Sequence, residues 1–112
     1  MNKILKFAPH LVPLILSGKK TATWRLFDDK DLSEGDSVDF LEHGTHRHFA
    51  TVLCTRVVEK PLNKLSDEDK RGHETYETDE EMYQMFSKYY DRPIGPDSIV
   101  KIIWYVITDI KS

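Results

Sequence analysis

The run from Arg47 to Val58 is dense in valine, threonine and phenylalanine, which favour an extended backbone, and Pro61 ends it. A second run of this kind, Ser98–Ile110, is rich in isoleucine and valine and closes the chain. Its period-two alternation predicts that one face lies in the core. That face carries Val100, Ile102, Trp104 and Val106. Two strands of this length predict a fold organised around a β-sheet.

Shorter strands are predicted before these runs, at Lys3–Phe7 and Ser37–Glu42. A third begins at Thr21, where the pattern again has period two. One face carries Thr21, Thr23 and Arg25, and the other carries Ala22, Trp24 and Leu26. We therefore expect Trp24 in the core, and the threonine and arginine face toward solvent or a ligand.

Helical signals separate the strands. Pro9 suits the first turn of a short helix that ends at Gly18, a residue that favours the left-handed C-cap. Thr78 and Glu81 have the spacing of a capping box. The helix after them carries an apolar face at helical spacing, for which core packing is the favoured interpretation. Its members are Met82, Met85, Phe86 and Tyr89.

The order strand, helix, three strands, helices, strand predicts an α+β fold rather than an alternating parallel one. About five to six strands in so small a domain bury their faces best as a small β-barrel with flanking short helices, because closure removes exposed edges. The length of 112 residues fits a single domain spanning residues 1–112.

Composition indicates a soluble globular protein, with 39% hydrophobic and 31% charged residues. No run reaches the roughly 20 apolar residues that cross a bilayer, and the N-terminal apolar stretch is too short for a signal peptide. We expect a cytoplasmic protein without membrane contact, a monomer by default. The lone Cys54 has no disulfide partner and is predicted to be a reduced core thiol.

Charge is unevenly distributed. The net charge of −3 argues against wholesale coating of nucleic acid, but residues 1–64 carry +2 and residues 65–112 carry −5. Eight of the 15 residues from Asp67 to Glu81 are acidic, and Ser66 can cap a short helix over Asp67–His73. Most of these carboxylates are expected to form a solvated face that favours the helix dipoles.

The segment SGKKTATWRL, from Ser17 to Leu26, is the strongest candidate site. Its cations and hydroxyls fit either a solvated basic corner or a site for an anionic or carbonyl-bearing ligand. Lys20 and Thr23 lie three apart, so they converge only if the chain bends near Thr21. A converging lysine with a lowered pKa can act as general base for the threonine hydroxyl.

This segment resembles the signature of the ASCH family, named for homology to an activating signal cointegrator. The matching residues are Gly18, Lys20, Thr21, Thr23 and Arg25. The resemblance extends along nearly the whole chain, through Leu5–Phe7, the Glu34–Asp36 turn and the acidic Leu65–Asp69 segment. It implies a PUA-like β-barrel whose motif lines a cleft that binds RNA or nucleotides.

One branch of the family resembles an amidohydrolase that removes the acetyl group of N(4)-acetylcytidine, a linear amide. The resemblance implies a catalytic group of Lys20, Thr23 and Glu74, with Glu68 and Glu77 as alternatives to the glutamate. Whether this chain is an enzyme stays open at this point, since the same residues suit simple binding. No cofactor is expected.

In the binding interpretation, which we favour, the partner is RNA or a modified nucleoside. Lys19, Lys20 and Arg25 hold a phosphate, with Thr21 beside them, and an aromatic ring stacks on a base. The candidate rings are Tyr76 and Tyr105. A regulatory protein-interaction domain is the third alternative.

Three histidines fall within the segment Glu42–His48, at a predicted hairpin turn. Such a cluster can bind a divalent metal, but no second group of ligands lies near it in the sequence. We therefore predict no metal site. The alternative is a rim that helps to hold RNA, with Arg47 on a phosphate.

Overall fold

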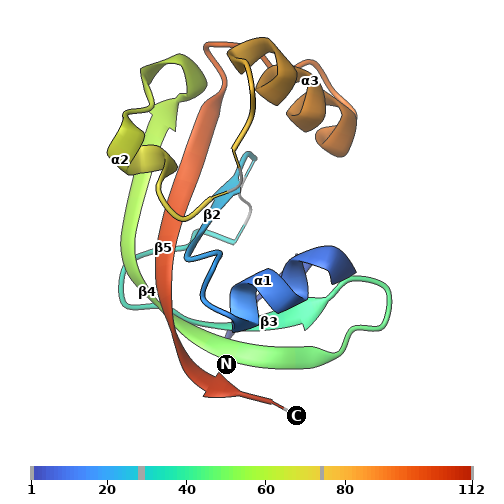
Figure 1. Ribbon diagram of the computed structural model, residues 1–112. Coiled ribbons are helices and arrows are strands. Elements are labelled where there is room, and N and C mark those ends of the chain that lie inside the picture. Colours follow the sequence, from blue (N-terminus) through green and yellow to red (C-terminus); the bar gives the residue numbers. More distant parts are fainter. Residues whose placement is uncertain (1, 28–29, 74, 112) are drawn as a thin grey trace.

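The computed structural model describes residues 2–27, 30–73 and 75–111 and contains five strands in that part of the chain (Figure 1). These strands are β1 (Lys3–Phe7), β2 (Ala22–Arg25), β3 (Ser37–Glu42), β4 (His48–Pro61) and β5 (Ile99–Ile110). The helices are α1 (Val12–Leu16), α2 (Asp67–Lys70) and α3 (Asp79–Tyr90), with short 3-10 turns η1 (Pro9–Leu11) and η2 (Leu62–Lys64).

All five strands form one sheet in the order β1-β3-β4-β5-β2. β1 runs parallel to β3, and the other neighbours are antiparallel. The long strands β4 and β5 bend strongly, so the sheet curls into a half-barrel whose edges are β1 and β2 (Figure 1). The predicted α+β fold with a small barrel-like sheet and flanking short helices is confirmed.

Two hydrophobic clusters fill the molecule. The first lies inside the curled sheet and includes Phe7, Phe40 and Phe49. The second lies under α3 and includes Trp24 and Phe86. β5 supplies both clusters, because its opposite faces are covered by different parts of the fold.

The prediction for β5 is therefore only half right. Val100 and Ile102 are fully buried in the second cluster, but Val106 is 50% exposed. Ile103 and Tyr105, on the opposite face, belong to the first cluster. The predicted face is apolar throughout, but buried residues of α3 cover only its first half.

The predicted helix caps are present. The Ser66 side chain accepts a hydrogen bond from the Asp69 amide, and that of Thr78 accepts one from the Glu81 amide. The first of these helices, α2, is shorter than predicted and ends at Lys70. Cys54 is buried, which raises the pKa of its thiol, as expected of a core cysteine. No helix in the described ranges has the length and apolar character needed to cross a membrane.

Candidate functional site

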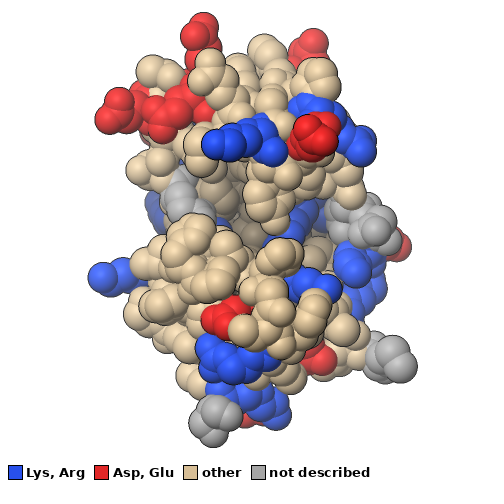
Figure 2. Space-filling view, turned by 90° about the vertical axis from the view of Figure 1, so that its right-hand side faces the viewer, with Lys and Arg blue, Asp and Glu red and all other residues tan. Residues whose placement is uncertain are grey.

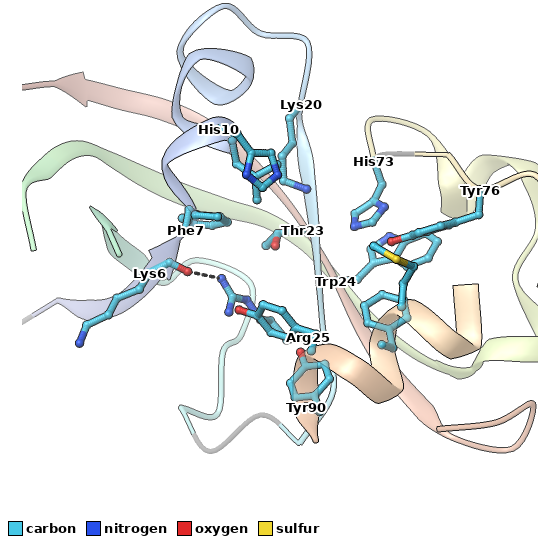
Figure 3. A pocket seen from close by; sticks show the side chains of 15 residues that line it. Lys6, Phe7, His10, Lys20, Thr23, Trp24, Arg25, His73, Tyr76 and Tyr90 are labelled. Carbon is cyan, nitrogen blue, oxygen red and sulfur yellow. Dashed lines mark hydrogen bonds between the residues drawn. The ribbon is translucent and has the colours of Figure 1, made fainter. Parts of the chain in front are cut away.

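A cavity of about 220 Å³ opens where the two edges of the half-barrel face each other, between η1, β2 and α3. Figure 2 shows the corresponding hollow in the middle of one face of the molecule, with Lys and Arg atoms inside it and along its edges. The lining combines cationic and aromatic side chains, which Figure 3 shows from close by.

Lys20 and Thr23 both line this cavity and are each only 4% exposed. Lys20 precedes β2, and its backbone is held at both ends of the residue. Its amide donates to the Leu14 carbonyl at 3.0 Å, and its carbonyl accepts from the Tyr105 hydroxyl at 2.7 Å. The chain therefore turns before β2, so that Lys20 and Thr23 point into one cavity (Figure 3).

Arg25 connects the two edge strands. Its Nη2 donates to the Lys6 carbonyl of β1 at 3.0 Å, and its guanidinium lies 5.0 Å from the centre of the Phe7 ring. Its Nε is buried and has no hydrogen-bond partner among the described residues. Arg25 nevertheless lines the cavity, so its guanidinium gives this wall a positive charge.

The opposite wall is aromatic. The Trp24 and His73 rings stack at a centroid distance of 4.0 Å and an angle of 9°. Tyr76, Phe86 and Tyr90 extend this wall. Trp24 is buried in the second cluster as predicted, yet it also lines the cavity, and its Nε1 has no partner in the described part of the chain.

The backbone of Gly72 binds the segment after α2 to the start of β2, the strand that carries Thr23 and Arg25. Its carbonyl accepts hydrogen bonds from the amides of Thr21 at 2.9 Å and Ala22 at 3.1 Å. Gly72 has a φ of +82°, and a Cβ there would collide with Thr21 Oγ1. Only glycine permits this approach, which brings His73 and Tyr76 to the cavity wall.

The predicted glutamate, Glu74, lies outside the described residues. The two alternatives do not line the cavity. Glu68 is paired with Arg56 of β4 at 3.3 Å, and Glu77 is exposed. The acidic segment is anchored instead by Asp69, which is 2% exposed and accepts from Lys60 Nζ at 2.6 Å.

Among the predicted binding residues, Lys20, Arg25 and Tyr76 line the cavity. Lys19 and Thr21 are exposed and stand outside the lining. The Tyr105 ring is packed in the first cluster against Phe40, at 5.0 Å, so it presents no face to the cavity.

The histidine-rich turn is separate from the cavity. His43 and His46 are exposed, whereas His48 Nε2 lies 3.0 Å from the Ala50 carbonyl and 3.5 Å from Asp39 Oδ1. Within residues 2–27, 30–73 and 75–111, no three potential ligands come together as a metal site.

Sequence reasoning missed several lining residues. Met85 and Tyr89 were expected in the core, but they are 54% and 68% exposed and line the cavity. Their helical spacing with Phe86 was the available signal, and it does not distinguish a core from a cavity wall. His10 and His73 carried no local signal, because only the tertiary fold brings them to this site.

No family model matches the sequence, and no curated protein matches it. Solved structures do match over most of the chain. Protein EF3133 from Enterococcus faecalis V583, of family model DUF984, is 22% identical over 100% of this chain and 83% of its own, with a TM-score of 0.81.

Two ASCH structures show the same architecture. ASCH from Zymomonas mobilis is 15% identical over 96% of this chain and 67% of its own, with a TM-score of 0.65. The ASCH domain from Lactobacillus crispatus JV V101 is 16% identical over 85% of this chain and 68% of its own, with a TM-score of 0.64. The chain therefore has the fold of ASCH domain proteins, as its motif indicated.

Proposed function

We propose that the protein binds RNA or a nucleotide, with one nucleoside unit in the cavity described above. The observation that carries the proposal is the meeting of two cationic side chains, Lys20 and Arg25, with the half-buried rings of His73 and Tyr76 in a single cavity. The buried Trp24 ring, which stacks on His73 at 4.0 Å, supports that wall from behind. Aromatic faces stack on bases, and guanidinium and ammonium groups bind phosphate.

The size of the cavity supports a small ligand unit. Its volume of about 220 Å³ is below the roughly 300 Å³ at which pockets for drug-sized ligands begin. One base with its sugar fits such a space better than a folded RNA element. The Arg25 guanidinium lines the cavity and is only partly buried, so it is available to a phosphate or base oxygen.

Calorimetric titration with nucleoside monophosphates and short single-stranded RNA, at two salt concentrations, tests the proposal. Arg25→Ala should weaken binding by about tenfold or more, and the loss should shrink at high salt. Because Arg25 also connects β1 and β2, thermal melts should accompany the titrations, and Arg25→Lys retains the charge.

Arg56→Ala provides the matched control. Arg56 lies outside the cavity, where its guanidinium covers Trp104 at 4.9 Å. Its removal should change affinity by less than about twofold. Equal effects of the two alanine variants, or no binding of any nucleotide or RNA by wild type, would contradict the proposal.

A second candidate function is amide hydrolysis of an acetylated cytidine, supported by the burial of Lys20 and Thr23 in one cavity. In this reaction Lys20 takes the proton of the Thr23 hydroxyl, and the oxygen attacks the acetyl carbonyl. The amine leaves with a proton, and water then releases acetate from the acyl-threonine. Arg25 would stabilise the developing oxyanion.

Chromatographic detection of cytidine from acetylated cytidine tests this candidate. Thr23→Ala should abolish turnover while binding is retained, and Thr23→Ser should restore part of it, because it keeps the hydroxyl. No product from wild type at high enzyme concentration would remove hydrolysis and leave the binding proposal in place.

A further inference from the structure

An exposed aromatic cluster adjoins the cavity at the C-terminal end of α3. Phe27 is 53% exposed and Tyr89 is 68% exposed, and both rings contact Tyr90. Their centroids lie 5.5 Å and 4.9 Å from that of Tyr90, which is itself part of the cavity wall. Arg92 places its guanidinium 4.3 Å from the centre of the Phe27 ring. We call Phe27, Tyr89 and Arg92 the aromatic rim.

The backbone holds this rim in place. The Leu26 amide donates to the Tyr90 hydroxyl at 3.0 Å, which ties the end of β2 to α3. Phe27 follows with a φ of 57°, a left-handed conformation that is unfavourable for a bulky side chain. At the end of α3, Asp91 also adopts the left-handed backbone conformation. The amide of the next residue, Arg92, donates a hydrogen bond to the Ser87 carbonyl at 3.2 Å, which fixes Arg92 against the helix end.

The rim has the chemistry of a stacking site. A single exposed aromatic side chain is ordinary, but two exposed rings and an arginine grouped beside a basic cavity form a sequence-tolerant platform for a base. The Arg92 guanidinium, stacked on Phe27, keeps its N–H edges available to a phosphate. Tyr90 lines the cavity and contacts both rim rings. The rim is therefore close enough to bind a base that is joined to the one in the cavity.

We propose that the aromatic rim binds the neighbouring base of a single strand, so that the ligand is an RNA of at least two nucleotides. This inference rests on the proposed function, since it needs a first base in the cavity. Free mononucleotides then occupy only half of the site.

Titration of wild type with a mononucleotide and with the dinucleotide that extends it, at one salt concentration, tests the inference. The dinucleotide should bind at least about fivefold more tightly. Phe27→Ala should remove most of this gain and leave mononucleotide affinity unchanged, because Phe27 does not line the cavity.

Arg92→Ala should have the same effect. Agreement of the two variants guards against a folding defect that is specific to Phe27→Ala. Val106→Ala, at a site 50% exposed on β5, is the matched control and should retain the gain.

The outcomes separate the two proposals. If wild type binds the mononucleotide but gains nothing from the second nucleotide, the rim inference is overturned and the cavity proposal stands. A gain that survives both Phe27→Ala and Arg92→Ala overturns it equally. If neither ligand binds, the proposed function itself fails, and the rim inference with it.

Discussion

The two hydrophobic clusters differ in what their aromatic rings do. In the first, Phe40 and Phe49 are 1% and 0% exposed and stand away from the cavity, so they serve packing alone. In the second, Trp24 and Phe86 are also buried, yet each presents part of its ring to the cavity. Stability and binding are therefore separable at Phe40 and Phe49, whereas they are coupled in the second cluster and at Phe7, the ring of the first cluster that lines the cavity.

The largest effect is expected inside the curled sheet. Phe40→Ala should lower the free energy of unfolding by about 3–5 kcal/mol, because Phe40 packs against Phe7, Phe49 and Tyr105. Denaturant unfolding measures the loss. Nucleotide affinity, measured on the fraction that remains folded, should stay within about twofold of wild type; a large change would show that the two clusters are not separable.

Phe86→Ala is the counterpart in the second cluster. Phe86 is 8% exposed and borders the cavity, so we expect a smaller loss of about 2 kcal/mol. Here affinity should fall as well, since the Phe86 ring supports Trp24 at a centroid distance of 6.2 Å. Unchanged affinity would break the coupling assigned to this cluster.

Asp69→Asn tests how firmly the segment beside the second cluster is anchored. Burial raises the pKa of the Asp69 carboxyl, but hydrogen bonds from Lys60 and Ser66 outweigh burial and hold the pKa below its ordinary value. We expect a loss of about 1–2 kcal/mol at pH 7, allowing for the partial solvation of Lys60.

The sign of the pH dependence follows from the lowered pKa. The stability from Asp69 is fully present above its ordinary pKa of 3.8 and is lost as the pH falls through the folded value. The gap between wild type and Asp69→Asn should therefore close in acid. A gap that widened as pH fell would refute the assigned direction.

The smallest change in stability is expected for Tyr89→Ala, within about 0.5 kcal/mol, because Tyr89 is 68% exposed. Its effect on ligand affinity should nevertheless be clear, since Tyr89 lines the cavity. Parallel melts and titrations compare the two quantities. A marked loss of stability would mean that Tyr89 belongs to the second cluster rather than to the binding surface.

The fold was largely predictable because its signals are local. Period-two alternation indicated β2, and a run rich in valine, threonine and phenylalanine indicated β4. Ser66 and Thr78 marked helix caps that the structure contains. The alternation also predicted that Thr23 and Arg25 of β2 face a ligand or solvent, and both line the cavity. The sequence could not predict which part of a strand face is buried, because burial depends on elements that are distant in the sequence. Val106 of β5, for example, is exposed because the second cluster ends before it.

The candidate site was predictable mainly where residues adjoin in the sequence. Among the described residues, Tyr76 is the one distant ligand contact named from the sequence that lines the cavity. Lys20 and Arg25 lie in one motif and share one cavity. His10, His73 and Tyr90 join them through the curl of the sheet and the docking of α3, for which no short-range pattern exists. Helical periodicity placed Met85 and Tyr89 on the correct face but assigned that face wrongly to the core.

Arg25 performs two tasks with one guanidinium group. One of its nitrogens joins the edges of the half-barrel through the Lys6 carbonyl, while the same group forms the basic wall of the cavity. An evolving lineage cannot exchange this cation for a neutral side chain, to suit an uncharged ligand, without also loosening the scaffold. Changes of specificity are thereby directed toward the rim, whose exposed side chains lie outside the sheet.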